Sequence, residues 1–195
     1  MATTIAVVAA GAMGSAVARR LVQKGCTVLT NLSGRSEATR KRALDVGMID
    51  ASYSSISERA SYVLSILPPS DALLFATKFA EASLKSNSEL LFVDCNAVNP
   101  VTVKKISAIF AGSQIGFVDA GIIGGPPGDD YDPVFYASAD DPNLLRKFDE
   151  LSEFGLKISL LEGDGAGIGD ASALKMSYAV GFVLQPAYQA LLTPV

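Results

Sequence analysis

The first 25 residues constrain the fold more than any other stretch of the chain. An apolar run, a turn of small residues and a segment of helical period follow one another there without a gap. Residues 4–9 predict a β-strand, and residues 12–24 predict a helix with apolar side chains at Met13, Val17 and Leu21. A strand that passes through a tight turn into a helix begins a βαβ unit. The chain is therefore expected to build a parallel sheet.

The same alternation of short apolar runs and helical segments continues over the first 160 residues. It predicts a Rossmann-type, doubly wound α/β fold with a mostly parallel sheet, followed by the start of a long C-terminal helix after about residue 169. The further strands are expected at residues 27–31, 62–67, 90–94, 116–120 and 134–137. The further helices are expected at residues 36–46, 69–83, 100–111 and 142–154, and the last three carry a proline in their first turn.

Charge and composition exclude several functional classes. The chain of 195 residues has a net charge of -4 and no basic stripe, which argues against nucleic acid as a partner. It contains no histidine, which excludes a Ser-His-Asp triad and histidine-ligated metals. Asp129, Asp130 and Asp132 lack the spacing of a calcium loop and predict an exposed loop instead of a metal site.

The cellular location is expected to be the cytoplasm. Cys26 and Cys95 lie far apart and suit reduced core thiols, and the first residues do not form a signal peptide. Residues 176–192 are apolar but only 17 residues long, and they include Gln185, Pro186 and Gln189. We expect a buried helix there and no membrane span.

The turn after the first strand is the candidate dinucleotide site. Unpaired N–H groups at the start of a helix attract a pyrophosphate, and Gly11 and Gly14 suit a close phosphate approach and tight helix packing. Ala9 stands where such turns usually have their first glycine, and plain packing is the alternative interpretation of the small residues. The predicted cofactor-binding residues of the turn are Ala10, Gly11, Ala12, Met13 and Gly14.

The end of the second strand predicts NADP in preference to NAD. An NAD site usually places Asp or Glu here for the ribose 2′-hydroxyl, whereas this chain has Asn31, followed by Ser33 and Arg35, with Arg40 one turn further on. Hydroxyls and a cation suit a 2′-phosphate. The alternative is that the cations between residues 35 and 42 form only a solvated helix face.

Five stretches resemble the β-hydroxyacid dehydrogenase group, the relatives of 6-phosphogluconate dehydrogenase and 3-hydroxyisobutyrate dehydrogenase. They are "AAGAMGSAVARRLVQKG", "SILPPSDA", "VDCNAVNP", "FVDAGIIGGPP" and "GIGDASALKMSYA". The resemblance implies an NAD(P)-binding Rossmann domain over residues 1–168 and an interdomain-type helix with the remnant of a helical domain over residues 169–195. It also implies that Leu67, Pro68 and Asn96 lie along the adenosine and nicotinamide riboses and that Lys175 is the catalytic residue.

The chain departs from that family where the substrate would bind. Ile123 replaces the family's carboxylate-binding serine, whereas Gly124 and Gly125 remain. Tyr178 stands where the family has an asparagine beyond the lysine. The resemblance implies that these four residues contact a small-molecule substrate that is not a conventional hydroxy acid.

Two functions follow from these patterns. The first is an NADP-dependent oxidoreductase that moves hydride between the cofactor and a hydroxyl or carbonyl substrate, with an imine as the alternative substrate and Lys175 as general acid and base. An apolar setting of Ala171, Ala173, Leu174 and Met176 is expected to depress the pKa of Lys175. Asp119 is expected to end a strand and to hydrogen-bond the turn after it.

The second function is a binding or interaction module without catalysis. In the relatives a helical domain of a hundred residues or more continues the C-terminal helix, and the chain is expected to lack it. Residues 176–192 would then associate with a second copy, most simply as a homodimer.

Overall fold

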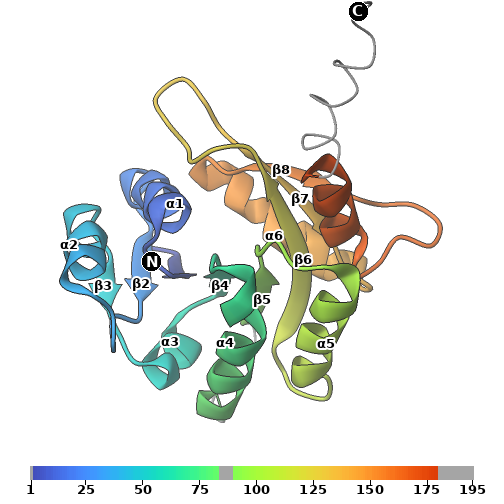
Figure 1. The fold of residues 1–195 in the computed structure, drawn as a ribbon, viewed down its shortest axis with the longest axis horizontal. Helices are drawn as coiled ribbons and strands as arrows, with labels where there is room; N and C mark the ends of the chain where they lie inside the picture. The colour runs from blue at the N-terminus through green and yellow to red at the C-terminus, as the bar shows by residue number, and fades with distance from the viewer. Residues whose placement is uncertain (1, 84–89, 180–195) are drawn as a thin grey trace, which may run out of the picture.

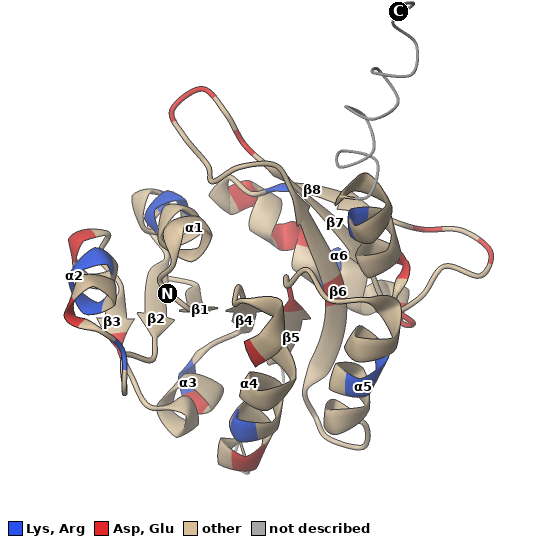
Figure 2. Ribbon diagram, in the orientation of Figure 1, with Lys and Arg blue, Asp and Glu red and all other residues tan. Residues whose placement is uncertain are grey.

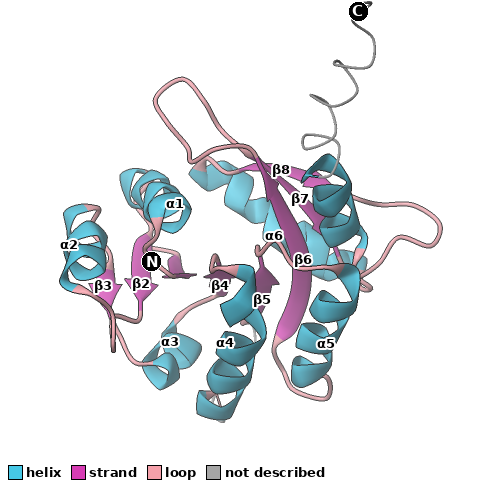
Figure 3. Cartoon of the chain, viewed as in Figure 1, coloured by secondary structure: helices cyan, strands magenta, loops and turns pink. Residues whose placement is uncertain are grey.

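A single eight-stranded sheet forms the centre of the molecule (Figures 1 and 3). The computed structural model describes residues 2–83 and 90–179. The strands lie in the order β3-β2-β1-β4-β5-β6-β7-β8, and every neighbouring pair is parallel except β6 and β7. This topology confirms the predicted Rossmann-type fold. The strands are β1 (Thr4–Val8), β2 (Thr27–Thr30), β3 (Ile49–Asp50), β4 (Tyr62–Ser65), β5 (Leu91–Asp94), β6 (Gly116–Ile123), β7 (Val134–Ser138) and β8 (Lys157–Leu160).

Helices cover both faces of the sheet and bury two separate cores. One core includes side chains of α1, α2 and α6, and the other includes side chains of α3, α4 and α5. Within β1, Ile5 belongs to the first core and Ala6 to the second, as alternation along a strand requires. The helices are α1 (Ala12–Gln23), α2 (Glu37–Asp45), α3 (Tyr53–Arg59), α4 (Pro69–Ala82), α5 (Pro100–Phe110), α6 (Pro142–Asp149) and the 3-10 helix η1 (Glu150–Phe154).

The helices begin where their sequences predict. Proline occupies the first turn of α4, α5 and α6, where its missing N–H removes no intrahelical bond. The Ser36 and Asn99 side chains each accept a bond from the third residue of the following helix. Met13, Val17 and Leu21 of α1 pack against the sheet as expected.

Some elements differ from the prediction. The sequence pattern missed β3, α3 and β8, because β3 has only two residues, both exposed, and β8 is never fully buried. The helix expected at residues 142–154 changes from α to 3-10 geometry at residue 150. Strand β6 continues to Ile123, three residues beyond its predicted end, because β7 returns antiparallel beside it.

A final helical segment, residues 170–179, packs against β6. The longer helix predicted from residue 169, and most of the expected association surface at 176–192, lie outside the described residues. The division at residues 168 and 169 stays a prediction. Across residues 2–83 and 90–179, no helix has the length and hydropathy needed to cross a membrane.

Candidate functional site

The turn between β1 and α1 presents an open main chain at the start of a helix. Gly11 is the exposed residue before the first helical turn, and a side chain added there would meet no atom within 4 Å. At Gly14, in contrast, an added Cβ would collide with the carbonyl oxygen of Ala9. The close packing predicted at Gly14 is therefore present, and the open space at Gly11 leaves room for a phosphate beside the first-turn N–H groups.

Arg42 of α2 reaches this turn. Its Nη1 donates to the carbonyl oxygen of Ala10 at 2.9 Å, across 32 residues of sequence. The sequence pattern left Arg42 among the cations of a solvated helix face. Only the packing of α2 beside the turn reveals that this guanidinium stands next to the candidate pyrophosphate site. Figure 2 shows Lys and Arg on α1 and α2 at this side of the sheet, with Asp and Glu also on α2.

The loop after β2 holds the residues predicted to distinguish NADP from NAD. The Asn31 side chain forms a hydrogen bond within the protein, because its Nδ2 donates to the carbonyl oxygen of Ala51 at 2.8 Å. Ser33 is exposed and Arg35 is partly exposed. The fold also brings in an acid that the sequence pattern missed, since Asp50 at the end of β3 accepts a bond from the Leu32 N–H at 2.9 Å.

Asn96 joins the ends of two strands below the surface. Its Oδ1 accepts from the Leu67 N–H at 2.5 Å, and its Nδ2 donates to Ser65 Oγ at 2.8 Å and to Asp94 Oδ1. Its side chain is 2% exposed, and Leu67 is buried as well. The structure brings Leu67 and Asn96 into direct contact, with Pro68 exposed beside them at the start of α4. Their contacts with a ribose stay a prediction.

Lys175 lies across β6. A Cβ added to Gly121 would stand 3.1 Å from the Lys175 Cβ and 2.9 Å from the Ala171 carbonyl oxygen. The helical segment 170–179 therefore packs closely on β6 at Gly121, which has no side chain to keep it away. This contact brings Lys175 to the carboxyl-terminal half of β6, next to the end of β5. Ligands of open α/β sheets bind beyond the carboxyl ends of the strands.

Asp119 anchors the helix that carries Lys175. Its carboxylate accepts bonds from the Gly169 N–H, the Ser172 N–H and the Ser172 hydroxyl at 2.8–3.1 Å, and from the Ser138 hydroxyl at 3.4 Å. The expectation that Asp119 bonds the turn after its own strand is wrong, because three of its bonds come from Gly169 and Ser172, 50 and 53 residues further on, and the fourth comes from Ser138 of β7. A carboxylate at the amino-terminal end of a helix stabilises both the unpaired N–H groups and the helix dipole.

Burial gives Lys175 an unusual environment. Desolvation lowers its pKa from the ordinary lysine value, while Cys95, Asp94 and Asp119 act in the opposite direction. Of the apolar residues expected to surround it, Ala171 is fully buried, whereas Leu174 and Met176 are 37% and 38% exposed.

The residues predicted to contact substrate lie at the end of β6 and one turn beyond Lys175. Ile123 is the last residue of β6, and Gly124 and Gly125 follow it on the surface. Tyr178 is 60% exposed. Ile123 thus lies two residues beyond Gly121, on which Lys175 packs, and the contacts of these residues with a substrate stay a prediction.

The loop between β6 and β7 folds back onto α1. Arg20 pairs with Asp132 at 2.9 Å and donates to the Gly128 carbonyl oxygen at 2.8 Å. Arg20 lies in the last turn of α1, and this loop covers its guanidinium. Asp129, Asp130 and Asp132 form the predicted loop, and the described part of the chain contains no cluster of three or more metal-ligating side chains.

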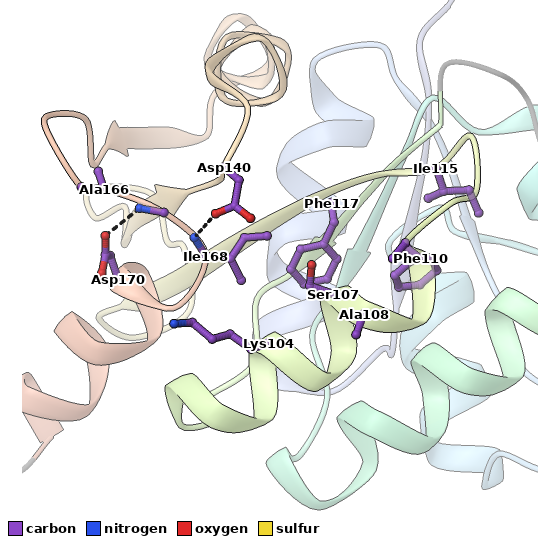
Figure 4. A pocket seen from close by; sticks show the side chains of 13 residues that line it. Lys104, Ser107, Ala108, Phe110, Ile115, Phe117, Asp140, Ala166, Ile168 and Asp170 are labelled. Atoms are coloured by element: carbon purple, nitrogen blue, oxygen red, sulfur yellow. Dashed lines mark hydrogen bonds between the residues drawn. The ribbon is translucent and has the colours of Figure 1, made fainter.

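A separate cavity of about 610 Å³ opens between α5 and the loop after β8 (Figure 4). Lys104, Phe117, Asp140 and Asp170 are among its lining residues. Asp140 and Asp170 already accept bonds from the N–H groups of Ile168 and Gly167. No lining residue belongs to the dinucleotide turn, so this cavity is distinct from the candidate site.

Comparison with known proteins gives a family match. The family model described as the NAD binding domain of 6-phosphogluconate dehydrogenase matches residues 4–158. No curated protein matches the chain.

Solved structures share the fold. A conserved protein of unknown function, described as structurally similar to 3-hydroxyacid dehydrogenases, is 30% identical with a TM-score of 0.76, over 91% of this chain and 63% of the other. 3-Hydroxyisobutyrate dehydrogenase from Mycobacterium tuberculosis is 21% identical with a TM-score of 0.74, over 99% and 67%. An imine reductase from Myxococcus stipitatus, solved as a variant with NAD+, is 21% identical with a TM-score of 0.78, over 98% and 65%. The chain thus spans roughly two thirds of the length of these proteins or slightly less.

Proposed function

Because the chain belongs to the family defined by the NAD binding domain of 6-phosphogluconate dehydrogenase, we propose that it is an NADP-dependent oxidoreductase with Lys175 as general acid and base. The observation that carries this proposal is the position of Lys175 across Gly121, desolvated and beside two buried carboxyl groups. A lysine in that setting exchanges a proton more readily than a surface lysine. The substrate proposed is a small molecule with a hydroxyl or carbonyl group, or an imine.

The dinucleotide would lie along the turn between β1 and α1. Gly11 offers open main chain, and the residues on either side, Ala10, Ala12, Met13 and Gly14, set the start of α1. Arg42 places a positive charge beside the turn. When bound, the nicotinamide supplies or accepts the hydride; the chain's own groups bind, orient and exchange the proton.

The preference for NADP rests on the loop after β2. Ser33 and Arg35 offer a hydroxyl and a cation, and Asn31 supports the loop through Ala51. Asp50 beside Leu32 acts against this preference, because its negative charge would repel a 2′-phosphate. Among the relatives, the imine reductase from Myxococcus stipitatus was solved with NADP+, and its variant with NAD+.

Lys175 performs the proton step in this proposal. In the oxidative direction the neutral amine accepts the proton as the substrate O–H bond breaks; in reverse the ammonium returns it to the carbonyl oxygen. Gly124 and Gly125 provide main chain at the surface, and Tyr178 is available one turn beyond Lys175. Ile123 presents no hydrogen-bond donor, so an apolar substrate group is expected beside it.

The first experiment is a pair of titrations of the full chain with NADPH and NADH, followed by nucleotide fluorescence. Tighter binding of NADPH that is lost in Arg35→Ala supports the cofactor assignment, and Lys41→Ala on the neighbouring helix face is the control. A panel of hydroxy acids, ketones and imines is then tested for turnover. Binding without any turnover, or turnover that survives Lys175→Met, overturns the catalytic proposal and leaves the binding module.

We further propose a cytoplasmic homodimer. Cys26 and Cys95 are buried free thiols, and Leu174, Met176 and Tyr178 expose apolar surface at the beginning of the C-terminal helix. Sedimentation equilibrium of the full chain tests the dimer. A monomer at all concentrations rules it out.

A further inference from the structure

A row of four polar side chains crosses the sheet below the candidate site. Register pairs Ser65 with Asp94, Asp94 with Asp119, and Asp119 with Ser138, on β4 to β7. Each of the four is at most 1% exposed. Residues in register on adjacent strands point to the same face, about 5 Å apart. Two carboxyl groups therefore lie side by side inside the protein.

The two carboxyl groups differ in how well they are hydrogen-bonded. Asp119 accepts from four donors. Asp94 accepts only from Asn96, through Oδ1, and among the described residues its buried Oδ2 has no hydrogen-bond partner. An unpaired carboxylate oxygen in the interior is costly, and native structures rarely keep one without a reason.

Lys175 is a cation near this row that lowers the pKa of Asp94. Gly121 follows Asp119 by two residues on the same face of β6, and the Lys175 stem rests on Gly121. The charged and titratable groups around it are Asp94 and Cys95 of β5 and its end, and Asp119 of β6. Tyr136 of β7 is in register with Gly121, and Lys104 of α5 approaches Gly169 at the start of the helix.

We propose that Asp94 is a positioning residue that acts on Lys175. Its carboxylate lies at the end of β5, has no hydrogen-bond partner at Oδ2 among the described residues, and stabilises the ammonium form of Lys175, which packs on β6. This inference rests on the proposed function, in which Lys175 exchanges the substrate proton. When the amine takes the hydroxyl proton, an N–H bond forms and the O–H bond breaks, and the new positive charge faces the Asp94 carboxylate. Asp119 is less suited to this task, because its oxygens are occupied in holding the helix.

The titration range of Asp94 agrees with that role. Burial, with a smaller contribution from Asp119, raises its pKa to about 7, although its bonds with Asn96 act in the opposite direction. Both protonation states of Asp94 are therefore populated near neutral pH. The titration of a carboxyl group is coupled to that of a lysine with which it interacts.

The test measures the proton affinity of Lys175 directly, with no substrate or cofactor. Lysines of the full chain are reductively dimethylated with ¹³C-formaldehyde and cyanoborohydride, and the Lys175 methyl signal, assigned by its loss in Lys175→Arg, is followed by NMR against pH. In Asp94→Asn the titration midpoint is expected to fall by about one pH unit, because a neighbouring anion is removed. Asp140→Asn, which removes an exposed carboxylate at the separate cavity, is the matched control and leaves the midpoint unchanged.

An unchanged Lys175 midpoint in Asp94→Asn overturns the inference. If this variant does not fold, as judged by circular dichroism, Asp94→Ser provides the same removal of charge with a smaller side chain. Failure of the proposed function gives a different result. If the Lys175 midpoint shifts in Asp94→Asn but the chain turns over no substrate, Asp94 and Lys175 interact and Lys175 has no catalytic role. If the wild type turns over substrate through Lys175 but Asp94→Asn does not shift the Lys175 titration midpoint, the proposed activity stands and Asp94 has no part in it.

Discussion

The turn at residues 9–14 and the region around Lys175 lie at the same end of the sheet but are built in opposite ways. The turn is a contiguous stretch whose main chain is open to solvent at Gly11. The Lys175 region assembles β5, β6, β7 and the helical segment 170–179, and its carboxyl groups are almost completely buried. An anion can therefore bind the turn without rearrangement, whereas charge in the Lys175 region is controlled by burial.

The difference shows which physical term governs each region. At the turn, unpaired N–H groups and the helix dipole supply the interaction, and solvent remains near. Around Lys175, desolvation is the largest influence on Asp94, Asp119 and Lys175 alike. Changes in the Lys175 region should accordingly alter stability and pH dependence more strongly than changes at the turn.

The pH dependence of stability should show the largest effect. Asp94 has a folded-state pKa of about 7, above its ordinary value of 3.8, so between these values the folded state binds more protons than the unfolded state. Its contribution to stability is therefore complete below pH 3.8 and is lost as pH rises through about 7, by a free energy of the order of 4 kcal/mol. Urea unfolding of the wild type and Asp94→Asn at pH 4 to 8 measures the difference, which should grow with pH in favour of the variant. Parallel curves for the two proteins would contradict the assignment.

Loss of the Asp119 anchor should come next. Asp119→Ala leaves the Gly169 and Ser172 N–H groups without their acceptor, and the free energy of unfolding is expected to fall by about 3 kcal/mol. Asp140→Ala is the control, since it removes one exposed carboxylate bond to the Ile168 N–H. Urea unfolding checks both variants. Equal losses in the two would mean that Asp119 does not hold the helix more firmly than a surface bond does.

The two glycines of the turn should separate folding from binding. Gly14→Ala places a Cβ against the Ala9 carbonyl oxygen and is expected to cost about 2 kcal/mol of stability. Gly11→Ala meets no atom within 4 Å, so it should leave stability unchanged and weaken NADPH binding, because the Cβ occupies the phosphate side of the turn. Thermal unfolding and fluorescence titration provide the two readouts. Unaltered NADPH affinity in Gly11→Ala would place the pyrophosphate elsewhere.

The smallest effect is expected at Arg42. Arg42→Ala removes one bond to the Ala10 carbonyl oxygen, and NADPH affinity should fall about fivefold, the equivalent of about 1 kcal/mol. Lys41→Ala, an exposed neighbour on α2, should bind NADPH as the wild type does. If the two variants weaken binding equally, the contribution of α2 is a general charge effect and the bond to the turn is not needed.

Local patterns in the sequence predicted most of the fold. Apolar runs marked β1, β2, β4, β5 and β7 to within a few residues, and prolines marked the starts of α4, α5 and α6. Short or half-exposed elements such as β3 and β8 lack such a pattern, because few of their side chains are buried. The sequence pattern could not predict that β7 runs antiparallel to β6 either, since an apolar run looks the same in a parallel and in an antiparallel pair of strands.

For the candidate site, the chain itself specifies the small residues of the turn and the presence of a lysine after "GIGDASAL", because both depend on residues adjacent in sequence. Only the tertiary structure brings Arg42 to Ala10, Asp119 to the helix at Gly169, and Asp94 into register with Asp119. The physical reason is that hydrogen bonds and pKa values depend on distance and burial in space. Residues 25 to 50 positions apart in sequence have neither a hydrogen bond nor a shifted pKa between them until the sheet has formed.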